Sequence, residues 1–214
     1  MKPILFNTEM VKAILNGRKT VTRRIVKPQP PENARMDFSD KYGVAFDYAT
    51  SPYPMPDEKI SYRPPYIPGD VLYIRETWAK PFLPDSDELH YRADYSRADK
   101  VLREGPYPDS KRVTDVRWRP SIHMPKDAAR IFLRVTNVRV ERLQEITDEG
   151  AKAEGANNGI GVSDKMRVTA IQRFQRIWDS TIKPADQLKY GWDANPYVWV
   201  IEFERCEKPE EVQP

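Results

Sequence analysis

The residues best suited to chemistry lie in one short basic segment near the N-terminus. The segment runs Ile14-Leu15-Asn16-Gly17-Arg18-Lys19-Thr20-Val21-Thr22-Arg23-Arg24 and brings an amine, two hydroxyls and three guanidinium groups together. Clustered cations create a local positive field even on a chain whose formal net charge is only +3. These cations could therefore contact the phosphates of a nucleic acid. The alternative is that they form an ordinary solvated face.

Several common types of catalytic site are excluded. The sequence contains no Gly-rich phosphate loop, no HExxH and no GxSxG motif. Its single cysteine, Cys206, and its two histidines, His90 and His123, do not form a Cys- or His-rich metal site. We therefore expect no metal and no cofactor. The single cysteine, the short apolar N-terminus and the lack of an apolar stretch of about 18 residues predict a cytoplasmic protein without a membrane span.

The hydrophobic pattern predicts the elements that must position the basic segment. Apolar residues at helical spacing predict a helix over residues 7–17, ended by Gly17, and β-branched residues predict a strand over 20–26. Further strands are expected over 71–78, 89–93, 129–140 and 197–203, and helices over 146–155 and about 164–180. We expect 19–26, 70–77, 130–140 and 197–204 to be strands of one curved sheet. Several strands with few helices favour a single α+β domain over residues 1–214.

Two regions are predicted to lie outside this sheet. Residues 28–68 hold nine of the twenty prolines, and proline cannot donate to a strand ladder. Residues 28–66 are therefore expected to form a Pro-rich insertion without regular strands. The charged residues at about 95–117 are expected to form a loop. A second basic run, 111–134, is expected to share a face with residues 12–27.

Four short segments, in this order, resemble the ASCH family, a branch of the PUA-like barrels associated with RNA and modified nucleosides. They are the basic segment itself, Pro68-Gly69-Asp70-Val71-Leu72, Leu143-Gln144-Glu145-Ile146-Thr147 followed by Glu154, and the strand Val198 to Phe203. The resemblance is to the larger, phage- or prophage-type members. It implies a PUA-like mixed β-barrel with peripheral helices.

The resemblance also implies three catalytic residues. A small bacterial member of the family removes the acetyl group from N(4)-acetylcytidine with a lysine, a threonine and a glutamate, which correspond here to Lys19, Thr22 and Glu154. A threonine hydroxyl needs a base, a desolvated lysine can serve as one, and a carboxylate can orient the lysine or move its proton. In a regular strand Lys19 and Thr22 would face opposite sides, so we expect Lys19 to belong to the turn or to precede a bulge.

A further set of residues is predicted to bind the nucleoside or nucleic acid. The set is Arg18, Arg23, Arg24, Arg75, Glu76, Trp78 and His123. We expect either Arg24 or backbone N–H groups at the Gly17 turn to stabilise an oxyanion. Arg75 and Glu76 are expected to form an ion pair at a strand end. Trp78 could stack on a base or pack in the core, and His123 could line the mouth of a pocket or be an ordinary structural histidine.

Three functions remain open from the sequence. The first is an ASCH-type protein that acts on RNA or a modified pyrimidine nucleoside by amide hydrolysis. The second is a non-catalytic RNA-binding module, and the third is a single-strand-specific ribonuclease that uses the same basic groove.

Overall fold

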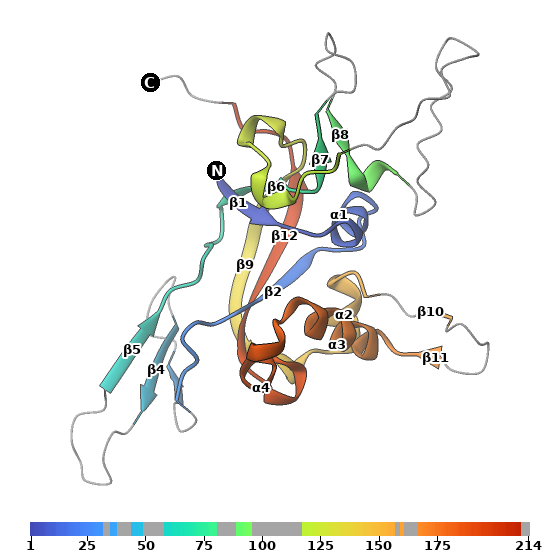
Figure 1. Ribbon diagram of the computed structural model, residues 1–214. Coiled ribbons are helices and arrows are strands. Elements are labelled where there is room, and N and C mark those ends of the chain that lie inside the picture. Colours follow the sequence, from blue (N-terminus) through green and yellow to red (C-terminus); the bar gives the residue numbers. More distant parts are fainter. Residues whose placement is uncertain are drawn as a thin grey trace, which may run out of the picture. The chain divides into compact units, whose positions relative to one another are not determined.

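The chain folds as an α+β protein, with many strands and few helices (Figure 1). The computed structural model describes residues 1–31, 35–37, 44–48, 58–80, 89–95, 117–156, 159–160 and 167–210. The sequence predicts a single domain. Contacts between residues divide the chain into two compact units. Unit 1 is Met1–Gly17, Val71–Leu133 and Arg205–Pro214, and unit 2 is Arg18–Asp70 and Arg134–Glu204.

Five strands are hydrogen-bonded in the order β1-β6-β9-β12-β2 as one mixed sheet. They are β1 (Lys2–Leu5), β6 (Val71–Arg75), β9 (Phe132–Arg142), β12 (Tyr197–Cys206) and β2 (Val21–Ile25). This confirms that the four predicted ranges belong to one sheet. β1 runs parallel to β6, whereas β12 runs antiparallel to β2. No pairing between the described strands closes this sheet into a barrel.

Unit 1 begins with β1 and the predicted N-terminal helix, α1 (Thr8–Leu15). The side chain of Asn7 caps α1 by accepting a hydrogen bond from the backbone N–H of Met10 (2.9 Å), and Gly17 follows the helix with φ of 70°. The predicted strand over 89–93 is shorter than expected, because β8 (His90–Tyr91) pairs with β7 (Trp78–Ala79) and a 3-10 turn, η1 (Arg92–Asp94), follows it. Two more 3-10 turns are η2 (Ser121–His123) and η3 (Lys126–Ala128).

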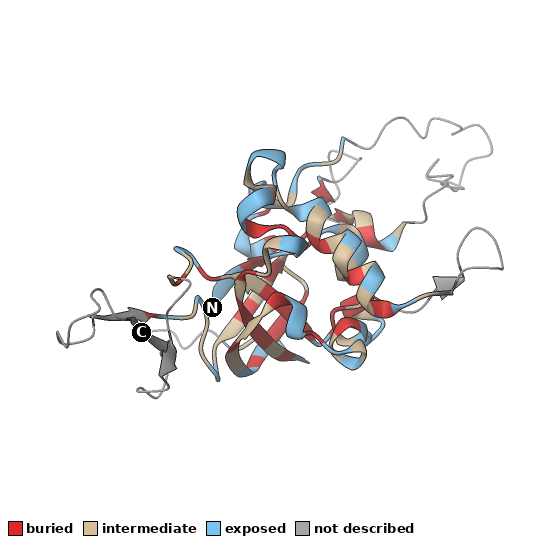
Figure 2. Cartoon of the chain, turned by 90° about the horizontal axis from the view of Figure 1, so that it is seen from below, coloured by how far each residue is buried: buried red, intermediate tan, exposed pale blue. Residues whose placement is uncertain are grey.

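Two helices and two strands of unit 2 pack around one apolar core, and a third, short helix comes after the second one in the chain. The helices are α2 (Asp148–Ala153), α3 (Ala170–Thr181) and α4 (Gln187–Tyr190), and the 3-10 turns are η4 (Leu143–Glu145), η5 (Pro184–Asp186) and η6 (Trp192–Ala194). Val21 of β2 and Val198 and Val200 of β12 meet Phe174 and Trp178 of α3 in this core. Figure 2 shows the buried residues in red along the strands and on the helices. The core therefore fixes one face of β2 against α3.

Helix α3 begins later than the sequence pattern predicts. It starts at Ala170 rather than near residue 164, because Thr169 and Gln172 form a capping box. Before it, β11 (Arg167–Val168) pairs with β10 (Gly159–Ile160). The capping box at Thr169 therefore sets the boundary between β11 and α3.

The prediction that residues 28–66 lack regular strands is wrong. This segment forms an antiparallel sheet in the order β3 (Arg35–Asp37), β4 (Val44–Tyr48) and β5 (Glu58–Tyr62). None of the three strands contains proline; the prolines precede β3, follow β5 or lie between β4 and β5. A proline cannot donate a backbone hydrogen bond at its own position in a strand, but the Pro-free stretches between the prolines can still pair.

Residues 96–116, which include most of the expected charged loop and the start of the basic run 111–134, lie outside the described residues. Among the helices of the described chain, none is long and apolar enough to cross a membrane.

Candidate active site

Lys19 lies between the turn at Gly17 and the first residue of β2. Its backbone forms an isolated antiparallel bridge with Glu154, and the N–H of Thr20 donates to the carbonyl of Ala153 (2.9 Å). These contacts hold the chain that enters β2 against the end of α2. Because β2 begins only at Val21, the strand alternation that separates Lys19 from Thr22 does not apply to Lys19.

The ammonium group of Lys19 is buried and surrounded by acceptors. The residue is 2% exposed, and its Nζ donates to the carbonyl oxygen of Val21 (2.7 Å) and to Oε2 (2.5 Å) and the backbone oxygen (3.0 Å) of Glu154. Burial lowers the pKa of Lys19, and Arg24 and Arg23 lower it further, whereas Glu154 raises it. The net shift is downward from the ordinary value of 10.5, while the three acceptors around Nζ match the three N–H groups of an ammonium.

Glu154 is the residue at which α2 ends. Its backbone N–H donates to Gly150 (3.0 Å), while Thr147 caps the start of the same helix by accepting from the N–H of Gly150 (3.0 Å). The carboxylate is buried between two cations, since Oε2 accepts from Lys19 and Oε1 accepts from Nη1 of Arg23 (3.4 Å). A carboxylate at a helix C-terminus is mildly unfavourable, and these two cations offset that cost.

Arg23 connects Glu154 to a second carboxylate. Its Nη2 donates to Oε2 of Glu141 on β9 (3.1 Å), and its guanidinium lies 5.7 Å from the ring centre of Phe174. Glu141 also accepts from Nε of Arg139 (2.5 Å), and Arg139 binds Glu202 on β12. Alternating charges therefore extend from Lys19 through Glu154, Arg23, Glu141 and Arg139 to Glu202.

Thr22 is a buried residue of β2, 2% exposed and opposite Ile201 of β12. Strand alternation puts Thr22 and Arg24 on the face opposite Val21 and Arg23. Lys19 is anchored at the peptide bond that joins Val21 to Thr22, since its Nζ binds the carbonyl of Val21. The structure thus joins Lys19 directly to Glu154 and places Thr22 at the neighbouring peptide.

The other predicted residues of unit 2 differ in exposure. Arg18 is exposed and Arg24 is half-buried, whereas Arg23 is buried against the two carboxylates. Tyr66 lies near Arg24: burial raises the pKa of the Tyr66 phenol, although the positive charge of Arg24 lowers it. Of these three arginines, Arg18 is therefore the most exposed.

The expected ion pair between Arg75 and Glu76 is wrong. Arg75 donates to the carbonyl oxygens of Met124 (2.9 Å) and Ile122, whereas Glu76 accepts from Nε (2.9 Å) and Nη2 (3.2 Å) of Arg130. Adjacent residues at a strand end point to opposite sides, so each side chain meets a different neighbour. Both belong to unit 1.

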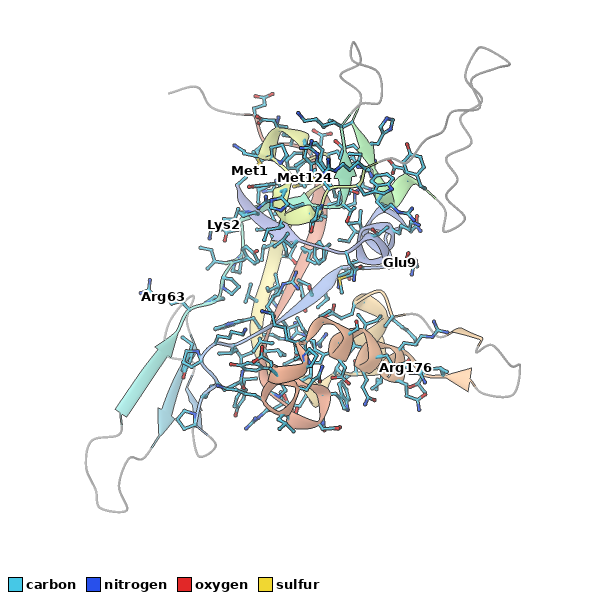
Figure 3. The ribbon with its side chains drawn as sticks, viewed as in Figure 1. Met1, Lys2, Glu9, Arg63, Met124 and Arg176 are labelled. Carbon is cyan, nitrogen blue, oxygen red and sulfur yellow. The ribbon has the colours of Figure 1, made fainter. Side chains whose placement is uncertain are left out.

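Trp78 and His123, also in unit 1, have contrasting environments. Trp78 is 4% exposed and packs with Met124 and Ala128. The guanidinium of Arg119 lies over its ring, 5.3 Å from the ring centre. Figure 3 marks Met124 among the side chains of this unit. His123 is exposed at the end of η2. Trp78 thus takes the core position rather than an open stacking position.

Sequence reasoning missed the residues that complete the two charge networks. It gave no role to Glu141 and Arg139 beside Arg23, or to Arg130, which binds Glu76 and both oxygens of Asp94 (2.8 Å each). The alternation of Arg139, Val140 and Glu141 in a strand was the available signal, because it puts two opposite charges on one face.

Comparison with known proteins found no matching family model, no matching curated protein and no matching solved structure. Within the described residues, no group of three or more His, Cys, Asp or Glu side chains could hold a metal ion. Function is therefore inferred from the residues themselves and from their geometry.

Proposed function

We propose that this protein is an ASCH-type amidohydrolase, with a PUA-like arrangement of its sheet, that removes the acyl group from an N(4)-acylcytidine-like nucleoside, free or within RNA, in the cytoplasm. One observation carries the proposal. A buried lysine whose amine binds a buried glutamate is anchored at the peptide bond of a buried threonine. An amine, a hydroxyl and a carboxylate in this order are the groups that acyl transfer from an amide requires.

The reaction begins at the hydroxyl of Thr22. Its oxygen attacks the acyl carbonyl carbon while Lys19, as the neutral amine, takes the hydroxyl proton. The tetrahedral intermediate collapses with cleavage of the C–N bond, and Lys19 returns the proton to the exocyclic nitrogen that leaves. Water then attacks the threonine ester while Lys19 takes one of its protons. The C–O bond to Thr22 breaks, Lys19 returns the proton to the Thr22 oxygen, and the carboxylic acid is released.

The remaining residues stabilise this sequence of steps. Glu154 holds the Lys19 amine in place through Oε2 and stabilises its charge whenever it carries the proton. Arg24 lies on the same face of β2 as Thr22, so it is the cation suited to the oxyanion. Burial lowers the pKa of Lys19, which is the direction that an amine acting as a base requires.

The binding-module alternative has less support from the geometry. A phosphate-contacting module needs exposed cations, yet Lys19 and Arg23 are buried and already bound to carboxylates. A buried cation of this kind contributes little to a phosphate groove.

The test is a turnover screen of the purified protein. N(4)-acetylcytidine, related acyl-cytidines and single-stranded RNA are incubated with the protein, and the products are separated by liquid chromatography. We expect cytidine to appear, and Lys19→Ala, Thr22→Ala and Glu154→Ala each to remove most of the turnover, far from additively. The control is Arg176→Ala, an exposed position on α3 that Figure 3 labels. Shortened RNA would instead indicate a nuclease, and binding without any product would indicate a binding module.

A further inference from the structure

The carboxylate of Glu154 is shared between two cations in an ordered way. Oε2 faces Nζ of Lys19 at 2.5 Å, and Oε1 faces Nη1 of Arg23 at 3.4 Å. A carboxylate held on one oxygen only can rotate, whereas one held on both oxygens by different elements has a defined plane. Lys19 precedes β2 and Arg23 lies within it, so the two donors approach Glu154 from separate positions.

Arg23 is itself fixed by contacts on its other side. Nη2 donates to Glu141 of β9, and the guanidinium lies beside the ring of Phe174 on α3. There is little spare room: a Cβ added at Gly150 of α2 would come within 3.4 Å of Nη2. Three elements thus determine where Arg23 points, and they point it at Glu154.

We infer that Arg23 is a positioning residue of this site: anchored by Glu141, it holds Oε1 of Glu154 so that Oε2 is presented to Lys19, and its charge weakens the hold of Glu154 on the Lys19 proton. The inference rests on the proposed function, in which Lys19 is the base. Arg23 does not touch the reacting atoms in this scheme. It acts through Glu154.

The electrostatics of the cluster agree with this role. The charged groups that face Lys19 are Glu154 at the end of α2 and Arg23 and Arg24 on β2. Glu154 raises the pKa of Lys19, and both arginines lower it. Loss of the Arg23 charge should therefore raise the pKa of Lys19, whereas loss of the Glu141 charge should leave Arg23 less neutralised and lower it. If Arg23 had only a structural role, losing its charge and losing that of Glu141 would not be expected to shift the pKa of Lys19 in opposite directions.

The test measures the Lys19 proton directly. Lysine side chains are isotopically labelled, the Lys19 signal is assigned with Lys19→Arg, and its titration midpoint is followed by NMR in wild type, Arg23→Gln, Arg23→Lys and Glu141→Gln. We expect Arg23→Gln to raise the midpoint by about one pH unit, Glu141→Gln to lower it, and Arg23→Lys to stay near wild type. The control is Arg176→Gln, which should leave the midpoint unchanged.

The pH profile of acyl-cytidine turnover provides the second measurement. The pH of half-maximal kcat should move with the NMR midpoint in each variant, with kcat affected more than KM. Unchanged midpoints, or shifts of the same sign in Arg23→Gln and Glu141→Gln, would overturn the inference. If Arg23→Gln does not fold, the downward shift in Glu141→Gln decides, because that variant keeps both cations and Glu154.

The two proposals fail in different ways. Midpoints that shift as expected in a protein that turns over no acyl-cytidine would support the role of Arg23 and contradict the proposed reaction. Turnover that is lost in Arg23→Gln while the Lys19 midpoint stays constant would support the reaction and contradict the role of Arg23.

Discussion

Lys19 and Glu154 are 135 residues apart in the chain and are joined by side chain and backbone together. Nζ of Lys19 binds both the carboxylate and the backbone oxygen of Glu154, and the two residues form an antiparallel bridge. The ion pair therefore does not depend on the side chains alone. The backbone that carries Lys19 is held to the end of α2, so the lysine has one defined place from which to reach the peptide of Thr22.

Conservative substitutions at Lys19 and Thr22 distinguish the loss of a reacting group from the loss of a charge. We expect Lys19→Arg to lose turnover as completely as Lys19→Ala, because a guanidinium stays protonated and cannot act as a base. Thr22→Ser should keep measurable turnover and Thr22→Val should not, since only serine retains the hydroxyl. Single-turnover kinetics with N(4)-acetylcytidine measures both. Full activity in Lys19→Arg would leave Lys19 only an electrostatic role and favour the binding module.

The buried amine of Lys19 should make stability depend on pH. Its pKa is lowered in the folded state from the ordinary value of 10.5, so between the two values the unfolded chain binds more protons, and the free energy of unfolding rises with pH. Relative to Lys19→Met, which carries no proton there, wild type should become more stable as the pH rises toward 10.5. Urea denaturation at several pH values measures this difference.

A matched lysine substitution controls for this effect. Lys183 is exposed, so Lys183→Met should differ from wild type by an amount that changes little over the same pH range. A difference between wild type and Lys19→Met that falls with rising pH would mean that Glu154 outweighs burial and that Lys19 is held as the ammonium.

In unit 1, Arg130 should contribute to stability through Glu76. Glu76 is 1% exposed and accepts two hydrogen bonds from Arg130, so Arg130→Gln leaves a buried carboxylate without its cation. We expect a loss of about 3 kcal/mol near neutral pH. Thermal and urea unfolding measure it, and the double variant with Glu76→Gln should lose less than the sum of the two single variants.

The pair of Glu76 and Arg130 also predicts how the cost of Arg130→Gln changes at acid pH. Burial raises the pKa of Glu76, while Arg130 lowers it. A carboxyl whose pKa is raised in the folded state stabilises the protein below its ordinary value of 4.5 and loses that contribution as the pH rises. The cost of Arg130→Gln should therefore shrink at acid pH, where Glu76 is protonated; a cost independent of pH would assign it to lost packing.

Local signals were enough to predict the elements around the site. Asn7 and Thr147 cap the helices that the sequence places there, Gly17 ends the first helix with a positive φ, and the β-branched run that includes Val21 forms β2. These features depend on neighbours in the chain, which is why the sequence pattern carries them. The prediction for the insertion at 28–66 was wrong because prolines show only where strand pairing is interrupted. They do not show whether the Pro-free stretches between them pair with one another.

By itself the sequence determined which residue types were available, and the proposed relation to the ASCH family singled out Lys19, Thr22 and Glu154. Strand alternation also puts Arg24 on the face of β2 that carries Thr22. Only the tertiary structure decided that Arg23 faces Glu154 and Glu141, and that Glu76 binds Arg130 rather than Arg75. The physical reason is that periodicity fixes which side chains share a face, whereas the groups packed over that face come from residues far away in the chain, and no local pattern encodes them.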